Sequence, residues 1–190
     1  MKSKIKEFYL GQNKSSSDFD EDITLADVLK ILNRNINFNE HTVSEQIELI
    51  YDRYGIAVSY IQLFEILIVK TLLVFKVIQD IEISPDELQA LYNKLSSRTL
   101  GVLIRELKSN YVFTDEQEKE LNDILQRRNF IVHEYFKGKE QSNYIQAGEE
   151  REKLFNEITK FIKDLLRVYG WLDKITAVAR KKFKANIEKN

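Results

Sequence analysis

Apolar residues recur every three or four positions along most of the chain, which is the period of an amphipathic helix. The longest such stretch follows Thr42 and carries Ile47, Ile50, Tyr51, Tyr54, Ile61, Phe64, Ile68, Leu72 and Phe75. A second long stretch follows Gly148 and carries Leu154, Ile158, Phe161, Leu165, Val168, Leu172 and Ile175. No stretch alternates as a half-buried strand does. We therefore predict an all-α fold, an antiparallel up-and-down helical bundle with additional helices.

Three capping boxes mark helix starts, each a Ser or Thr followed three residues later by Glu or Gln. They are Thr42 with Glu45, Ser84 with Glu87, and Thr114 with Gln117. Pro85 fits the first helical position, where its missing N–H has no cost. The third box opens a helix that we expect to run to about Phe136. Further helices are predicted over residues 24–34, over residues 99–107, and after Gly148.

The predicted domain organisation is a flexible or loosely packed arm over residues 1–22, which are polar, acidic and serine-rich, followed by one helical domain over residues 23–190. The most apolar stretch, Ile61 to Ile78, is interrupted by charged residues, which favours a buried core helix over a membrane span. The N-terminus lacks the apolar region of a secretory signal, and the chain contains no cysteine. We therefore expect a cytoplasmic protein without a membrane partner.

Charge limits how nucleic acid could bind. The formal net charge is −1, so any affinity for RNA has to be local. One local concentration of cations, near the C-terminus, consists of Arg180, Lys181, Lys182 and Lys184. These residues could contact RNA phosphates, or they could simply complement the dipole at the end of a helix.

The segment around His133, one of two histidines, combines apolar and basic residues on a predicted helix. At about 100° per residue, one direction collects Leu121, Ile124, Leu125, Ile131, Val132 and Tyr135. Arg128 lies at the centre of this apolar face. Its neighbour Arg127 falls among Glu120, Asp123 and Glu134, so we expect Arg127 to face solvent.

A guanidinium on a buried face needs a partner. Arg128 could pair with a carboxylate such as Glu65 or Glu106, lie at a subunit interface, or line a pocket for an anion. Asn129 and His133 lie one turn apart on a flank of the same face. Arg128 and His133, however, are about 140° apart on a regular helix. Since one helix aligns these two residues poorly, we expect a composite site that two copies of the chain complete.

The segment Arg128-Asn129-Phe130-Ile131-Val132-His133-Glu134-Tyr135-Phe136 resembles the motif of the HEPN superfamily, in which Arg is followed after four to six residues by His. The resemblance implies a homodimeric, metal-independent endoribonuclease without a cofactor, acting as a toxin or phage-defence effector. It implies that Arg128 binds the scissile phosphate, that His133 is the general acid or base, and that Asn129 orients the histidine or holds a phosphate oxygen.

Tyr135 matches a position that can be modified in HEPN toxins that are paired with a nucleotidyltransferase antitoxin. The resemblance therefore implies RNA as substrate and an antitoxin of this kind, or another defence partner. Two alternatives remain open: a catalytically silent HEPN-like dimer that binds RNA or serves as a scaffold or regulatory module, and an unrelated helical interaction domain in which Arg128 pairs with Glu65 or Glu106.

Overall fold

The computed structural model describes residues 25–33, 36–80, 82–134 and 148–189, and all regular structure in these ranges is helical. The elements are α2 (Leu25–Leu32), the 3-10 turn η1 (Phe38–Glu40), α3 (Val43–Gln79), α4 (Pro85–Ser96), α5 (Leu100–Asn110), α6 (Asp115–Asn129), the π-helical turn η2 (Phe130–Glu134) and α8 (Gly148–Lys189). The predicted all-α bundle is confirmed. The predicted arm, residues 1–22, lies outside the described residues.

All three predicted capping boxes are confirmed, at the starts of α3, α4 and α6. In each, the Ser or Thr side chain accepts from the backbone N–H three residues later, and the Glu or Gln side chain accepts from the backbone N–H of the Ser or Thr. Pro85 occupies the first turn of α4, as predicted. Local sequence therefore fixed where these helices begin.

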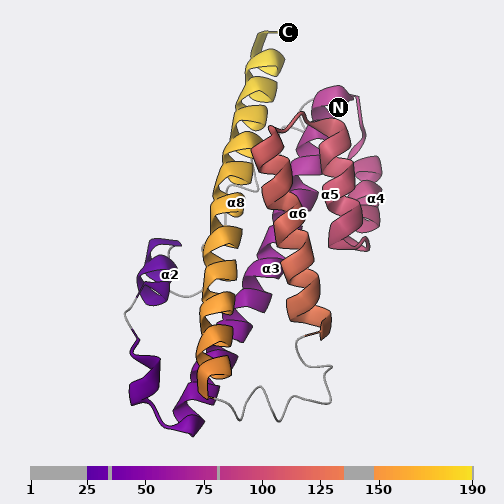
Figure 1. Ribbon diagram of the computed structural model, residues 1–190. Helices are drawn as coiled ribbons and strands as arrows, with labels where there is room; N and C mark the ends of the chain where they lie inside the picture. Colours follow the sequence, from indigo (N-terminus) through magenta and orange to yellow (C-terminus); the bar gives the residue numbers. More distant parts are fainter. Residues whose placement is uncertain (1–24, 34–35, 81, 135–147, 190) are drawn as a thin grey trace.

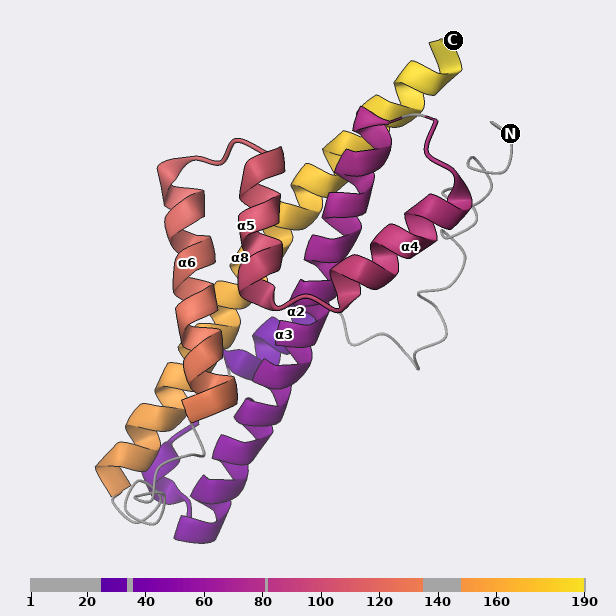
Figure 2. The same cartoon turned by 90° about the vertical axis from the view of Figure 1, so that its right-hand side faces the viewer.

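Successive long helices alternate in direction, so that the first and last, α3 and α8, run parallel (Figure 1 and Figure 2). Two side-chain contacts define their register. Gln46 accepts from Arg151 at 2.7 Å, and Thr71 contacts Thr176 at 2.7 Å; both pairs are separated by 105 residues in sequence. A constant separation at two distant points means that the two helices run side by side in the same direction.

The core lies between α3 and α8 and is completed by α5 and α6. Its largest fully buried side chains are Phe64, Ile68, Leu95, Leu100, Leu103, Leu107, Leu121, Ile124, Ile158, Phe161, Ile162 and Leu165. Thr71 and Thr176 meet inside this core, and each hydroxyl also approaches the carbonyl four residues earlier in its own helix. Two hydroxyl protons can satisfy only two of these three contacts.

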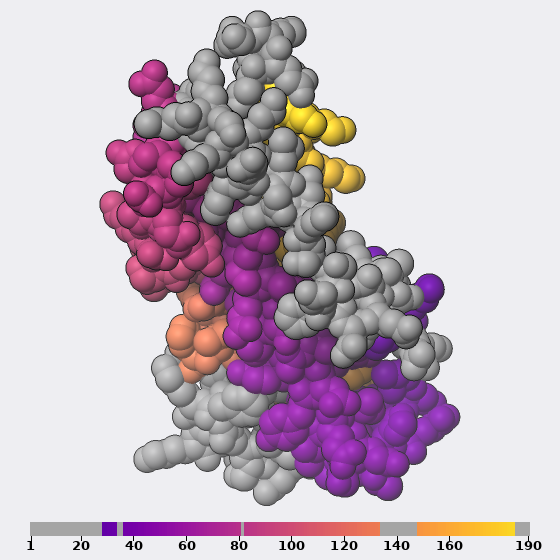
Figure 3. Space-filling view, turned by 180° about the vertical axis from the view of Figure 1, so that it is seen from behind, coloured from indigo at the N-terminus to yellow at the C-terminus, as the bar shows by residue number. Residues whose placement is uncertain are grey.

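One side of α3 stays at the surface, and Figure 3 shows this helix along the back of the molecule. Leu63 and Ile66 on α3 keep exposed fractions of 46% and 45%. Tyr51, predicted as part of the apolar face, is also exposed. Within the described ranges, no helix has both the length and the apolar character needed to cross a membrane.

Candidate active site

Arg128 lies at the end of α6 and gathers three polar partners. Its Nη2 donates to Glu65 Oε1 on α3 at 3.0 Å. Its Nη1 donates to Asn129 Oδ1 at 3.3 Å and lies 3.2 Å from His133 Nε2. A single chain therefore brings together all three residues predicted to be catalytic. The carboxylate of Glu65, one of two partners that the sequence left open, joins them; the other, Glu106, pairs with Arg98.

The prediction that one helix aligns Arg128 and His133 poorly is wrong. It assumed a regular α-helix to about Phe136, whereas α6 ends at Asn129 and Phe130–Glu134 forms a π turn. Hydrogen bonds in a π turn join residues five apart instead of four, so the wider turn brings residue i+5 back toward residue i. Arg128 and His133 have this spacing. The argument from helical geometry for a second copy at the site therefore fails.

The contact between Arg128 and His133 also assigns the imidazole tautomer. Arginine has no acceptor atom, so Arg128 must donate and Nε2 of His133 must accept with its lone pair. A neutral His133 that makes this hydrogen bond carries its ring proton on Nδ1. In this arrangement Arg128 occupies the nitrogen that a general base would use, and it has to release that nitrogen before His133 can accept a proton there.

Arg128 is half-buried, with 18% of its side chain exposed, while Glu65 keeps 30%. Within the described part of the chain, the Arg128 Nε is the one buried side-chain nitrogen or oxygen without a hydrogen-bond partner. The prediction of a buried-face arginine is therefore confirmed in part. Of the apolar residues predicted on that face, Leu121, Ile124 and Ile131 are buried, whereas Val132, within the π turn, is 37% exposed.

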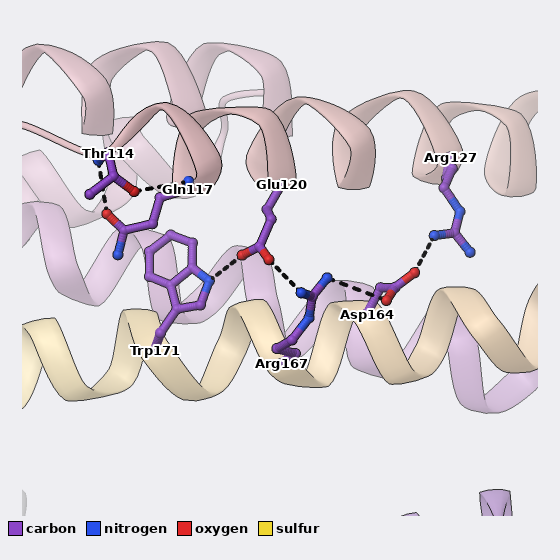
Figure 4. A network of polar contacts seen from close by, with 7 residues as sticks. All are labelled: Thr114, Gln117, Glu120, Arg127, Asp164, Arg167 and Trp171. Carbon is purple, nitrogen blue, oxygen red and sulfur yellow. Dashed lines mark hydrogen bonds and ion pairs between the residues drawn. The ribbon is translucent and has the colours of Figure 1, made fainter.

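The prediction that Arg127 faces solvent holds only in part, since 32% of its side chain is exposed and the rest packs against α8. Its Nη1 donates to Asp164 on α8 at 2.7 Å, and its guanidinium lies over the Phe161 ring, 5.1 Å from the centroid. Figure 4 shows the network that continues along α8. Arg167 links Asp164 to Glu120, and Glu120 also accepts from Trp171 Nε1 at 2.8 Å.

This α6–α8 network, comprising Glu120, Arg127, Asp164, Arg167 and Trp171, was missed from sequence. Glu120 was placed on the wet face, yet only 15% of its side chain is exposed. A signal was present: Asp164, Arg167 and Trp171 follow a spacing of three and four, the helical period, so all three lie on one side of α8.

The structure does not bring the basic residues near the C-terminus to Arg128. Arg180, Lys181, Lys182 and Lys184 are exposed on the last part of α8. Their start lies roughly 24 Å along α8 from Asp164, at 1.5 Å per residue. Phe183, between them, packs against Val77, Ile83 and Leu88. Tyr135 lies outside the described residues. Within the described ranges, no three His, Cys, Asp or Glu side chains are grouped as metal ligands would be.

Comparison with protein-family models, with curated proteins and with solved structures gave no match to this chain.

Proposed function

We propose that the protein is a metal-independent endoribonuclease of the HEPN type, acting as a toxin or phage-defence effector. The observation that carries the proposal is the contact of Arg128 with both His133 and Asn129. A planar cation beside an imidazole suits cleavage of RNA, since the cation can hold a phosphate while the imidazole moves a proton.

In the proposed reaction, the substrate phosphate takes over the donors that Arg128 now directs to Glu65 and His133. The freed Nε2 of His133 removes the proton of the ribose 2′-hydroxyl, whose oxygen attacks phosphorus. The bond from phosphorus to the 5′-oxygen then breaks, and that oxygen receives a proton. The products are a 2′,3′-cyclic phosphate and a 5′-hydroxyl, and Arg128 stabilises the charge that develops on the phosphate oxygens.

The proposal includes a homodimer, on grounds separate from helix geometry. The attacking and leaving oxygens lie in line on opposite sides of phosphorus. One imidazole cannot reach both, and the chain has one other histidine, His41, which lies beside Glu45 at the start of α3. His133 of a second copy would supply the other proton transfer. An antitoxin of the nucleotidyltransferase type, acting on Tyr135, is the proposed partner.

The test compares His133→Ala with His41→Ala on a labelled single-stranded RNA. We expect His133→Ala to lower the cleavage rate about 10²- to 10⁴-fold, the usual contribution of a general acid or base, and His41→Ala to leave it unchanged. Analysis of the wild-type product should show a 2′,3′-cyclic phosphate, and light scattering should give the mass of a dimer. Equal rates for the two variants contradict the proposal.

A second function is favoured by one observation, the ion pair of Arg128 with Glu65. This pair already neutralises the arginine, as in a catalytically silent scaffold or RNA-binding module. Under this alternative, purified wild-type protein binds RNA or a protein partner and leaves RNA intact, and His133→Ala changes neither property.

A further inference from the structure

A groove separates the end of α6 from residues 154–161 of α8. Its volume is about 440 Å³, within the range of about 300–1,000 Å³ of small-ligand sites. Its lining residues are Gln126, Arg127, Phe130, Ile131, Leu154, Glu157, Ile158, Lys160 and Phe161. Ile131, Ile158 and Phe161 are buried and form an apolar floor.

Phe130 connects this groove to the candidate active site. It lies between Arg128 and His133 in the chain and belongs to the same π turn as His133. Its ring is 53% exposed, although it lines the groove. An exposed aromatic ring two residues along the chain from Arg128 provides a surface on which an unpaired base can stack.

The charged residues of the lining favour a base within the groove and a phosphate at its rim. Glu157 would repel a phosphate placed inside, whereas its carboxylate can accept from the N–H groups of a base. Lys160 is exposed, and no ion pair involves it among the described residues, so its ammonium is available to a neighbouring phosphate. Arg127 is already held by Asp164.

We propose that this groove is a nucleobase subsite, in which an unpaired base of the substrate stacks on Phe130 while Lys160 holds an adjacent phosphate. The inference rests on the proposed function and extends it, because it makes single-stranded RNA the substrate class. A base-paired strand keeps its bases stacked within the duplex, so it cannot fill the groove.

The test measures RNA binding in a His133→Ala background, where the probe is not cleaved. The probes are a short single-stranded RNA and an oligomer of the same length whose riboses carry no bases. Phe130→Ala should weaken RNA binding about 5- to 150-fold, the contribution of one stacked base. Phe130→Trp should retain it. The matched control Tyr92→Ala removes an exposed aromatic ring from α4 and should have no effect.

The base-free oligomer should bind the Phe130→Ala variant and its parent equally. The inference is overturned if Phe130→Ala keeps full RNA affinity, if it loses affinity equally for both probes, or if it changes the oligomeric state, which would make the groove a contact between copies. Failure of the two proposals is distinguishable. If RNA binding depends on Phe130 but the wild type does not cleave RNA, only the nuclease proposal is refuted. If the wild type cleaves RNA and Phe130→Ala does not change the cleavage, only the subsite is refuted.

Discussion

Replacing Glu65 by glutamine should lower the stability of the protein and raise its affinity for RNA. The carboxylate holds Nη2 of Arg128 at 3.0 Å, with 18% of the arginine and 30% of the glutamate side chain exposed. Exposed ion pairs contribute up to about 1 kcal/mol, and breaking a fully buried pair costs about 3–5 kcal/mol. The exposure of this pair lies between these two cases, and the glutamine side chain still offers an oxygen that can accept from Arg128. We therefore expect the unfolding free energy to fall by about 1–2 kcal/mol, which corresponds to about 2–8 °C in Tm.

On the proposed function, the same substitution removes the group with which an RNA phosphate would compete for Arg128. If the phosphate no longer displaces a carboxylate, the released 1–2 kcal/mol corresponds to a gain of about 5- to 30-fold in affinity. Thermal unfolding measures the first effect, and fluorescence anisotropy with a single-stranded RNA measures the second. Opposite signs for stability and binding are the expected result.

The matched control is Glu106→Gln, which removes the charge of another arginine–carboxylate pair, formed by Arg98 in the α4–α5 turn and Glu106 on α5, with exposed fractions of 29% and 31%. This control should lose stability without any change in RNA affinity. The reasoning is refuted if Glu65→Gln leaves RNA affinity unchanged or lowers it together with stability. That result would make Glu65 a structural partner of Arg128 and nothing more.

Three further predictions concern stability and are checked by chemical denaturation. Asp164→Asn should lower the unfolding free energy by about 1 kcal/mol, since it removes a half-buried partner of Arg127; no loss would show that the α6–α8 network is dispensable. Thr71→Val and Thr176→Val should each lower the unfolding free energy by about 0.5–1.5 kcal/mol, because each removes one of the two hydrogen bonds that the two hydroxyl protons can form. The two losses should add within about 0.5 kcal/mol in the double variant. A strong deviation from additivity would contradict the assignment of one hydrogen bond to each hydroxyl proton. Hydrogen bonds from the backbone N–H and hydroxyl of Ser84 lower the pKa of Glu87 below the ordinary 4.5. The Glu87 carboxylate therefore stabilises the fold above pH 4.5, and this stabilisation is lost as the pH falls through the lowered pKa. The wild type should be more stable than Glu87→Gln at neutral pH, and a difference that persists at strongly acidic pH would contradict this prediction.

Much of the fold could be predicted because it depends on local or averaged features of the sequence. A capping box needs only two residues three positions apart, so all three helix starts were found. The buried face of α8 follows from apolar spacing, and Ile158, Phe161, Leu165, Val168 and Leu172 are all buried. The parallel course of α3 and α8 follows once helices alternate in direction, since an odd number of long helices returns the last to the direction of the first.

The candidate site was predicted less well because it departs from regular geometry. A calculation at 100° per residue cannot anticipate a π turn, and the turn determines where His133 and Val132 point. Arg127 was misplaced for a different reason. The residues predicted to share its side of α6 are acidic, but its partners, Asp164 and Phe161, come from another helix. Pairings between distant helices do not appear in the periodicity of either one.

The two consecutive arginines explain how the end of α6 is held and which part of the site can move. Arg127 joins α6 to α8 through Asp164, while Arg128 reaches α3 through Glu65. Both also complement the negative end of the α6 dipole. Because α3 and α8 pack against each other along the core, these two arginines tie the end of α6 to both core helices. On the proposed function, a substrate phosphate would gain Arg128 through a change of side-chain rotamer, from Glu65 and His133 to the phosphate oxygens, and that rotation would free the His133 nitrogen that the proposed reaction needs.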